Sequence, residues 1–163
     1  MAQARLRELI ERLAAAEVEF VVVGGLAVNA WGHLRGTRDL DIVPDPAGEN
    51  LERLATVLEA LGGRVEVAEG RLGPSAIRTF LAAGDRTLVA TELAPVDVLQ
   101  GHPQVPRFAD LDRDAVDVDL GGVNVRVCSL DALRAMKQAS NRPQDRDDLE
   151  ALDVANSWEI DRP

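Results

Sequence analysis

Two aspartates one residue apart, Asp39 and Asp41, point to the clearest chemistry in this sequence. Residues two apart on a strand face the same side of a sheet, so the two carboxylates are expected to stand side by side. Leu40 between them would face the opposite way, into a core. Adjacent like charges on one face repel each other unless cations bridge them. The spacing therefore predicts a platform for divalent metal ions, with pairing to Arg35 or Arg38 as the alternative.

Gly24 and Gly25 end a run of β-branched residues and would lead directly into a helix. Because glycine lacks a Cβ, a phosphate can approach its backbone, and free N–H groups at a helix N-terminus point toward that phosphate. A glycine pair alone is more often a simple turn. Here the Asp39-x-Asp41 pattern follows, and the combination predicts a phosphate beside the metal platform.

Asp97 supplies a third carboxylate, between the apolar residues Val96 and Val98 of a short predicted strand. If that strand neighbours the one that carries Asp39 and Asp41, all three carboxylates face one cleft. Three carboxylates that hold two Mg²⁺ ions about 4 Å apart, with Mn²⁺ as an alternative ion, suit an in-line displacement at phosphorus. We therefore predict that these aspartates are both the metal ligands and the catalytic residues.

The other reactive side chains indicate structural roles. His33 and His102 are predicted at the surface, and Cys128 is predicted in the core. Asp117-x-Asp119 repeats the acidic spacing on an expected edge hairpin, where it predicts a solvated face. Two histidines and one cysteine do not make a zinc site.

Alternating helices and strands are expected to position these residues. Helices are predicted over 3–16, 26–31, 47–61, 130–140 and 144–157, and strands over 20–23, 39–43, 65–67, 95–99, 115–119 and 123–127. Residues 76–82 and 86–91 could pair as a hairpin, although 75–82 also fits a helix. The last two predicted strands alternate around Gly121-Gly122 as a hairpin, and Ser129 is expected to cap the helix that follows.

This order of elements indicates an α/β (α+β) domain, a small mixed sheet flanked by helices. A single domain is expected over residues 1–163, with a core over about 17–128 and a C-terminal helical pair over about 129–158.

Composition disfavours several classes of partner. The net charge of −10 opposes non-specific binding to nucleic acid and to membranes, and only 3% of residues are aromatic, which leaves few platforms for stacking bases. With one cysteine and no apolar run near about 18 residues, a cytoplasmic location is expected. Lys137 is the only lysine among 18 basic residues, which suggests either a need for a compact point charge or a coding bias toward arginine.

The series Gly24-Gly25, Asp39-Leu40-Asp41 and a later strand aspartate, Asp97, resembles the nucleotidyltransferase superfamily of the DNA polymerase β type. The stretch from His33 to Ile42 is similar to small bacterial nucleotidyltransferases related to AbiEii-type toxins and to minimal nucleotidyltransferase antitoxins. That group often carries His-Gly-x-x-Arg-x-Thr-x-Asp-x-Asp. Here the threonine and both aspartates match, whereas the order of residues 33–36 is shuffled.

The C-terminal part resembles the closing segment of the same group. Met136-Lys137 is followed by Arg142-Pro143-Gln144-Asp145, where the group has a helix ending in Met-Lys and then Arg-Pro-x-Asp. By resemblance, Lys137 faces the nucleotide phosphates, and Arg142 with Asp145 braces the helix junction. The alternative is that Arg142 and Asp145 only cap and pair across the break.

The resemblance implies a nucleotidyltransferase fold and an Mg²⁺-dependent enzyme. Such an enzyme transfers a nucleoside monophosphate from a bound nucleoside triphosphate, such as ATP, to a hydroxyl acceptor and releases pyrophosphate. Asp39 and Asp41 would ligate both ions, and Asp97 would ligate the second ion and act on the attacking hydroxyl. The nucleotide-binding residues implied are Gly24, Gly25, Thr37, Arg38, Lys137 and Arg142.

The acceptor is open at this point: a protein hydroxyl, a tRNA end or a small molecule such as an antibiotic. The short chain favours a protein or a tRNA, and a partner protein would fit a toxin–antitoxin-type system. The alternative reading is a catalytically weak module of the same fold that binds or regulates a partner. Retention of all three carboxylates favours the enzyme.

Overall fold

The most hydrophobic segments of the chain form the centre of the computed structural model, which describes residues 1–157. Strand β1 (Phe20–Val23) is buried along its whole length. Strand β2 (Leu40–Pro44) is buried except at Asp41, which is half-buried. Short β-branched runs that are buried on both faces belong in the middle of a sheet. The two strands that carry the predicted motifs are therefore held rigidly by the core.

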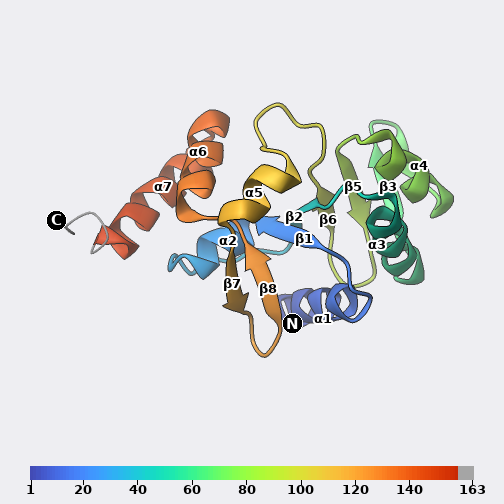
Figure 1. The fold of residues 1–163 in the computed structure, drawn as a ribbon, viewed down its shortest axis with the longest axis horizontal. Helices are drawn as coiled ribbons and strands as arrows, with labels where there is room; N and C mark the ends of the chain where they lie inside the picture. Colours follow the sequence, from blue (N-terminus) through green and yellow to red (C-terminus); the bar gives the residue numbers. More distant parts are fainter. Residues whose placement is uncertain (158–163) are drawn as a thin grey trace.

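Eight strands form one mixed sheet in the order β4-β3-β5-β6-β2-β1-β8-β7 (Figure 1). The others are β3 (Arg64–Val67), β4 (Gly70–Leu72), β5 (Thr87–Ala90), β6 (Val96–Val98), β7 (Val116–Asp119) and β8 (Asn124–Val127). β2 runs parallel to β6 and β1 runs parallel to β8, whereas the other neighbours are antiparallel. The mixed sheet and the predicted β7–β8 hairpin are confirmed.

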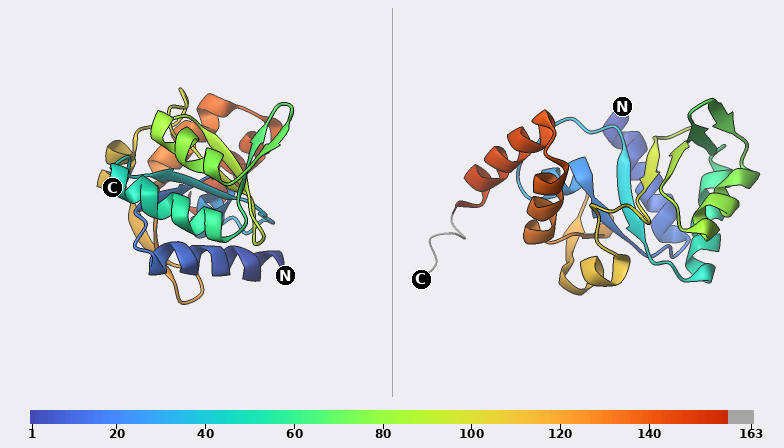
Figure 2. Two further views of the ribbon diagram at one scale, coloured as in Figure 1. Left: turned by 90° about the vertical axis from the view of Figure 1, so that its right-hand side faces the viewer. Right: turned by 90° about the horizontal axis from the view of Figure 1, so that it is seen from above.

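Helices flank the sheet at both ends. They are α1 (Ala2–Ala15), α2 (Gly24–Ala30), α3 (Gly48–Ala60), α4 (Ser75–Ala83), α5 (Phe108–Asp114), α6 (Leu130–Ser140) and α7 (Pro143–Ala155). Helices α3 and α4 pack together at one end of the molecule, and the C-terminal pair α6 and α7 lies at the other (Figures 1 and 2). Among residues 1–157, no helix is both long enough and apolar enough to cross a membrane.

The junction between α6 and α7 follows from its sequence. Ser129 accepts a hydrogen bond from the Ala132 backbone at 3.1 Å and caps the start of α6, as predicted. Asn141 ends α6 in the left-handed conformation at φ 48°. Pro143 then begins α7, where its fixed φ suits the first helical position.

Of the two alternatives left open for residues 75–82, the helix is confirmed: residues 75–83 form α4, so β5 pairs with β3 and β6 and forms no hairpin with 76–82. Two other local features differ from the sequence expectations. α2 already begins at Gly24, whereas the predicted helix begins at 26. β4 and α5 are short elements without a clear apolar period, and the sequence did not predict them. The expected end of the helical pair at residue 158 lies outside the described residues.

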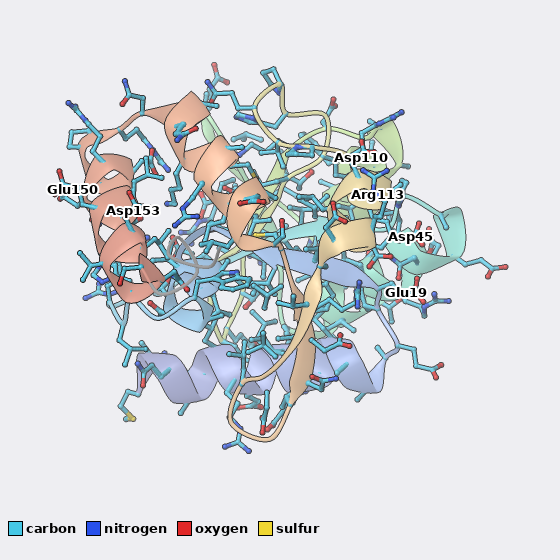
Figure 3. All side chains as sticks on the ribbon, turned by 60° about the vertical axis from the view of Figure 1, so that its left-hand side comes forward. Glu19, Asp45, Asp110, Arg113, Glu150 and Asp153 are labelled. Carbon is cyan, nitrogen blue, oxygen red and sulfur yellow. The ribbon has the colours of Figure 1, made fainter. Side chains whose placement is uncertain are left out.

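A buried polar side chain, Asn50 of α3, ties the outer ends of β1 and β2 together. Its Nδ2 donates to the backbone oxygens of Glu19 at 2.8 Å and Asp45 at 2.9 Å, and its Oδ1 accepts from the Glu19 backbone at 2.7 Å. The Glu19 and Asp45 side chains themselves point outward beside this junction (Figure 3). Asn50 thus fixes the end of the β1–β2 pair that is remote from the glycines.

Candidate active site

The sheet register brings two of the predicted carboxylates together. In the parallel pair of β2 and β6, Asp41 lies directly opposite Asp97. In the antiparallel pair of β1 and β2, Val23 lies opposite Asp41. Directly opposed residues of neighbouring strands project on the same face of a sheet. Asp41 therefore stands between Asp97 on one side and the end of β1, where the glycines begin, on the other.

Gly24 packs against the Asp41 carboxylate. A Cβ built at this position would overlap Asp41 Oδ2, and the backbone has a φ of 65°, which L side chains rarely adopt. The backbone N–H of the next residue, Gly25, donates a hydrogen bond to Asp41. The glycine pair thus cradles a carboxylate as well as forming the first turn of α2.

Asp41 carries the strongest sign of an uncompensated charge. Burial, together with the negative charges of Asp97 and Asp39, raises the pKa of Asp41 from 3.8 to about 6. The hydrogen bond from Gly25 and the charge of Lys137 lower it only in part. Since a nearby cation favours the ionised form of a carboxylate, this position suits a bound metal ion.

Asp97 has a cation partner that the sequence did not predict, Arg86. The Arg86 guanidinium donates from Nε to Asp97 Oδ1 at 3.0 Å and from Nη2 to Oδ2 at 2.6 Å. Arg86 immediately precedes β5, and Leu88 of that strand lies opposite Asp97. The ion pair raises the pKa of Arg86 further above its ordinary value. Both oxygens of Asp97 are therefore engaged.

The donor set fits a hard divalent cation, although it is not assembled as a cage. Carboxylate oxygens are the ligands that Mg²⁺ and Mn²⁺ prefer. Within residues 1–157, no three His, Cys, Asp or Glu side chains already converge as ligands of one ion. Asp97 is held toward Arg86, and Asp39 is exposed just before β2. The half-buried Asp41, beside two more carboxylates, suits such an ion. The side chains of Asp39 and Asp97 would have to move for all three carboxylates to bind one ion.

Thr37 and Arg38 lie away from this centre. Thr37 contacts the position that a Cβ of Gly25 would take, and its Oγ1 donates to the Asp39 backbone oxygen at 3.3 Å. Arg38 is exposed and lines a separate depression with Arg5. Thr37 thus packs against Gly25 and holds the Asp39 backbone, and the structure does not bring Arg38 to the predicted phosphate site.

Lys137 is buried between two aspartates of α7. Its Nζ lies 3.0 Å from Asp145 Oδ1 and 2.9 Å from Asp148 Oδ2, and neither carboxylate is exposed. Hydrogen bonds from Arg142 and Lys137 outweigh burial and hold the pKa of Asp145 well below its ordinary value. Hydrogen bonding to Lys137 and Arg35 likewise lowers the pKa of Asp148. Lys137 is thereby fixed at the cleft with two of its three hydrogens used.

Arg35 and Arg142 join the same network from its two sides. Arg35 Nε lies 2.8 Å from Asp148 Oδ1, which links the loop before β2 to α7. Within residues 1–157, neither Arg35 nor Arg38 forms an ion pair with Asp39 or Asp41, so the alternative pairing is not observed. Arg142 donates from its backbone and from Nε to Asp145 Oδ2, both at 3.0 Å. The predicted brace between Arg142 and Asp145 is thus present, and it is also the N-terminal cap of α7.

A cleft of about 420 Å³ lies over these groups, and part of its wall was not predicted. The predicted residues that line it are Gly24, Asp39, Asp41, Asp97, Lys137 and Arg142. The opposite wall comes from His102, Gln104 and Val105, in the irregular segment between β6 and α5, and from Met136 and Ser140 of α6. That segment has no periodicity that could have revealed it, and His102 was expected only at the surface.

The far wall is held in place by its own hydrogen bonds. The Gln104 side chain donates to the Ala139 backbone oxygen at 3.1 Å, which ties the segment to α6. The Gln104 backbone N–H donates to His102 Nδ1 at 3.1 Å. A neutral His102 therefore carries its proton on Nε2 and can act as a hydrogen-bond donor in the cleft.

Comparison with known families agrees with this geometry. Residues 2–162 match the family described as "Nucleotidyltransferase of unknown function (DUF6036)". The chain belongs to this nucleotidyltransferase family. No curated protein matches the sequence.

Solved nucleotidyltransferases share the fold of this nucleotidyltransferase. The lincosamide antibiotic adenylyltransferase LnuA, solved with lincomycin bound, superposes with a TM-score of 0.63 at 15% identity, covering 94% of this chain and 97% of that one. ANT(2")-Ia, solved in complex with adenylyl-2"-tobramycin, gives a TM-score of 0.59 at 19% identity, covering 94% and 90%. At these identities the likeness concerns the fold alone. The nucleotidyltransferase architecture predicted from the sequence is confirmed.

Cys128 lies in the core and the second Asp-x-Asp pattern lies on an exposed face, as predicted. Cys128 is fully buried, and burial raises the pKa of its thiol to about 12. The Trp31 indole donates to the Cys128 backbone oxygen at 2.9 Å. Asp117 and Asp119 are exposed on β7. None of these four residues lines the cleft over Asp41.

Proposed function

We propose that this nucleotidyltransferase transfers a nucleoside monophosphate from a nucleoside triphosphate to a hydroxyl acceptor, in a reaction that depends on Mg²⁺ or Mn²⁺. The observation that carries the proposal is the position of Asp41. It lies opposite Asp97, against a glycine that admits no side chain, with a pKa raised to about 6 by burial and by neighbouring carboxylates. A protein keeps such an unfavourable charge where a cation or a reacting group uses it.

The chemistry is a displacement at the α-phosphorus. The acceptor oxygen forms a bond to phosphorus, the bond to the bridging oxygen of pyrophosphate breaks, and the acceptor hydroxyl loses its proton. Asp39 and Asp41 are the residues that would hold the metal ions, which neutralise the triphosphate charge and stabilise the leaving group. Asp97 lies where it can accept the hydroxyl proton or complete the metal site.

The remaining cleft residues bind and orient the donor. Gly24 has no side chain and so leaves the space that the Asp41 carboxylate occupies, and Gly25 keeps that carboxylate in place through its N–H. Lys137 has one hydrogen left to donate after pairing with two aspartates. The Arg142 side chain is 71% exposed and lines the cleft, so it can reach a phosphate while its backbone caps α7. Thr37 supports the loop, and the proposal gives Arg38 no direct role.

ATP is the donor to test first, because the solved proteins with this fold include adenylyltransferases. For the acceptor we propose a hydroxyl of a protein or of a tRNA. Those two solved adenylyltransferases carry lincomycin and an adenylylated tobramycin, so antibiotics form the second group to test. A place in a toxin–antitoxin-type system rests on the resemblance of residues 33–42 and stays a prediction.

The experiment compares ATP labelled on the α-phosphate with ATP labelled on the γ-phosphate, each with Mg²⁺ and a fractionated cell extract. The proposal expects the α-label, and not the γ-label, in protein or RNA that requires the added enzyme. The other three nucleotides and a panel of antibiotics extend the donor and acceptor arms. Transfer of the γ-label, or no transfer from any donor, would overturn the proposal.

One observation favours a second candidate, a catalytically weak module that binds or regulates a partner. Asp97 is occupied by Arg86, and the three carboxylates do not converge on one ion. If the pair of Arg86 and Asp97 persists with nucleotide and metal bound, the site can hold a nucleotide without transferring it. Nucleotide binding by wild-type protein without transfer, unchanged in Asp97→Asn, would support this candidate.

A further inference from the structure

Arg86 and Asp97 form the ion pair with the shortest N–O distance among the described ion pairs of the cleft. The two hydrogen bonds from Arg86 to Asp97, at 3.0 and 2.6 Å, engage both carboxylate oxygens. Planar bidentate pairs of this kind are among the strongest side-chain hydrogen bonds. The Asp97 side chain is 13% exposed, whereas the Arg86 side chain is 51% exposed. The carboxylate is therefore fixed in the sheet, and the arginine approaches it from the solvent side.

The strand register explains why Arg86 reaches this carboxylate. Leu88 of β5 lies opposite Asp97, so Arg86, two residues earlier on the same face, is the diagonal neighbour of Asp97. A long side chain spans that distance easily. Arg86 itself lies outside the regular strand, and within residues 1–157 its guanidinium forms hydrogen bonds to Asp97 alone.

The pair has a consequence for cation binding. A guanidinium that occupies both oxygens of Asp97 places a full positive charge beside the position where a metal ion would bind. Asp41 lies directly opposite Asp97 in the sheet, and in the described part of the chain it has no bidentate arginine of this kind. The three carboxylates thus differ: Asp97 is already paired with the Arg86 guanidinium, whereas Asp39 and Asp41 lack such a bidentate partner in the described part of the chain.

We propose that Arg86 is a positioning residue that holds Asp97 in place of a metal ion, and that metal binding at the carboxylates displaces it. This inference rests on the proposed function, because it concerns the metal ions of that same site. The exposed arginine can swing into solvent without disturbing the sheet, whereas Asp97 stays in its strand. Asp97 therefore becomes available as a metal ligand only when the arriving metal ion displaces Arg86.

The test measures Mn²⁺ binding directly, through the electron paramagnetic resonance signal of free Mn²⁺. The variants are Arg86→Gln, Asp97→Asn and the double variant. Arg126→Gln is the matched control, since Arg126 forms a similar exposed pair, with Asp112 at 2.7 Å, on β8 and away from the cleft. We expect Arg86→Gln to bind Mn²⁺ at least about fivefold more tightly than wild type, because a competing charge has gone. The control should match wild type.

The double variant decides whether the effect acts through Asp97. The gain from Arg86→Gln should disappear when Asp97→Asn is also present. Equal or weaker binding by Arg86→Gln, or a gain that persists without the Asp97 carboxylate, would overturn the inference while the proposed function stands. Absence of Mn²⁺ binding in wild type and in every variant would instead reject the metal-dependent function, and this inference with it.

A second, more conservative variant keeps the inference testable if Arg86→Gln does not fold. Arg86→Lys keeps the charge but cannot occupy both oxygens with one planar fork. If Arg86→Gln does not fold, Arg86→Lys should still bind Mn²⁺ more tightly than wild type, by about twofold or more. Binding equal to or weaker than that of wild type would contradict the competition.

Discussion

Gly24 lies so close to the Asp41 carboxylate that no side chain fits between them. A Cβ at residue 24 would overlap Asp41 Oδ2, and φ at that residue is positive. The same glycine thus follows β1, begins α2 and leaves the space that the Asp41 carboxylate occupies. This relationship explains why a glycine and an aspartate seventeen positions apart in the printed sequence belong to one site.

Gly24→Ala is expected to remove activity. The added methyl group must push Asp41 away, and the positive φ adds about 1 kcal/mol of backbone strain. We expect transfer to fall by about 100-fold or more, since displaced charged groups lose their contact with the transition state. Rates with labelled nucleotide measure this loss. Gly36→Ala is the matched control, because a Cβ there has nothing within 4 Å and the variant should keep wild-type activity.

Asp41→Asn is expected to stabilise the protein at neutral pH while removing its activity. The pKa of Asp41 is about 6 in the folded protein and 3.8 without the fold, so the folded state binds the proton more tightly. Its free energy of unfolding therefore falls as the pH rises from about 4 to about 6, and the ionised carboxylate stays unfavourable above that range. An asparagine cannot ionise, and we expect a gain of about 1–3 kcal/mol at about pH 7.

Urea unfolding of both proteins with a chelator present, from about pH 4 to pH 8, tests this pH dependence. The two free energies should be close near about pH 4, separate as the pH rises from about 4 to about 6, and keep a constant difference above that range. A constant difference across the range, or an Asp41→Asn protein that is less stable than wild type at neutral pH, would show that Asp41 is already compensated in the folded state.

Lys137→Met is expected to destabilise the protein strongly. The change leaves Asp145 and Asp148 buried without their shared cation, although Arg142 and Arg35 still contact them. Breaking a buried ion pair on one side costs about 3–5 kcal/mol, and urea unfolding measures it. Arg7→Gln is the control, since Arg7 and Glu11 form an exposed pair whose loss should cost less than about 1 kcal/mol. A cost for Lys137→Met as small as that of the control would mean that the network does not support the fold.

Asn50→Ala is expected to lower stability without changing the chemistry. Three backbone groups of the β1–β2 junction lose their partner, at a cost of about 1–3 kcal/mol. Because the cleft lies elsewhere, the transfer rate at a temperature where the variant is folded should equal that of wild type. Asn124→Ala, at an exposed position of β8, should change neither property. A lower rate in folded Asn50→Ala would show that the outer junction positions the aspartates.

The central part of the site could be predicted from local sequence. An apolar run followed by two glycines predicts a strand that leads into a helix, and alternating aspartates in an apolar run predict the acidic face of β2. Asp97 could be predicted because one carboxylate inside a short apolar strand requires an explanation. In each case the signal lies within a few residues, where periodicity and turn chemistry act.

The parts that were not predicted depend on pairing between distant elements. Arg86 reaches Asp97 only because β5 pairs with β6, and that register is not readable from either strand alone. The partners of Lys137 come from the turn spacing of α7, which places Asp145 and Asp148 on its buried face, whereas Glu150 lies on the outer face (Figure 3). The segment between β6 and α5 that carries His102 is irregular, so its sequence has no helical or strand periodicity from which its position could be predicted.

The most direct test of the central claim is transfer of the α-label from ATP with Mg²⁺ by wild type, Asp41→Asn and Asp117→Asn. Asp117 belongs to the second Asp-x-Asp pattern, exposed on β7, and controls for the loss of one acidic residue. We expect transfer by wild type and by Asp117→Asn, and a loss of at least about 100-fold in Asp41→Asn. Transfer that survives in Asp41→Asn would contradict the central claim.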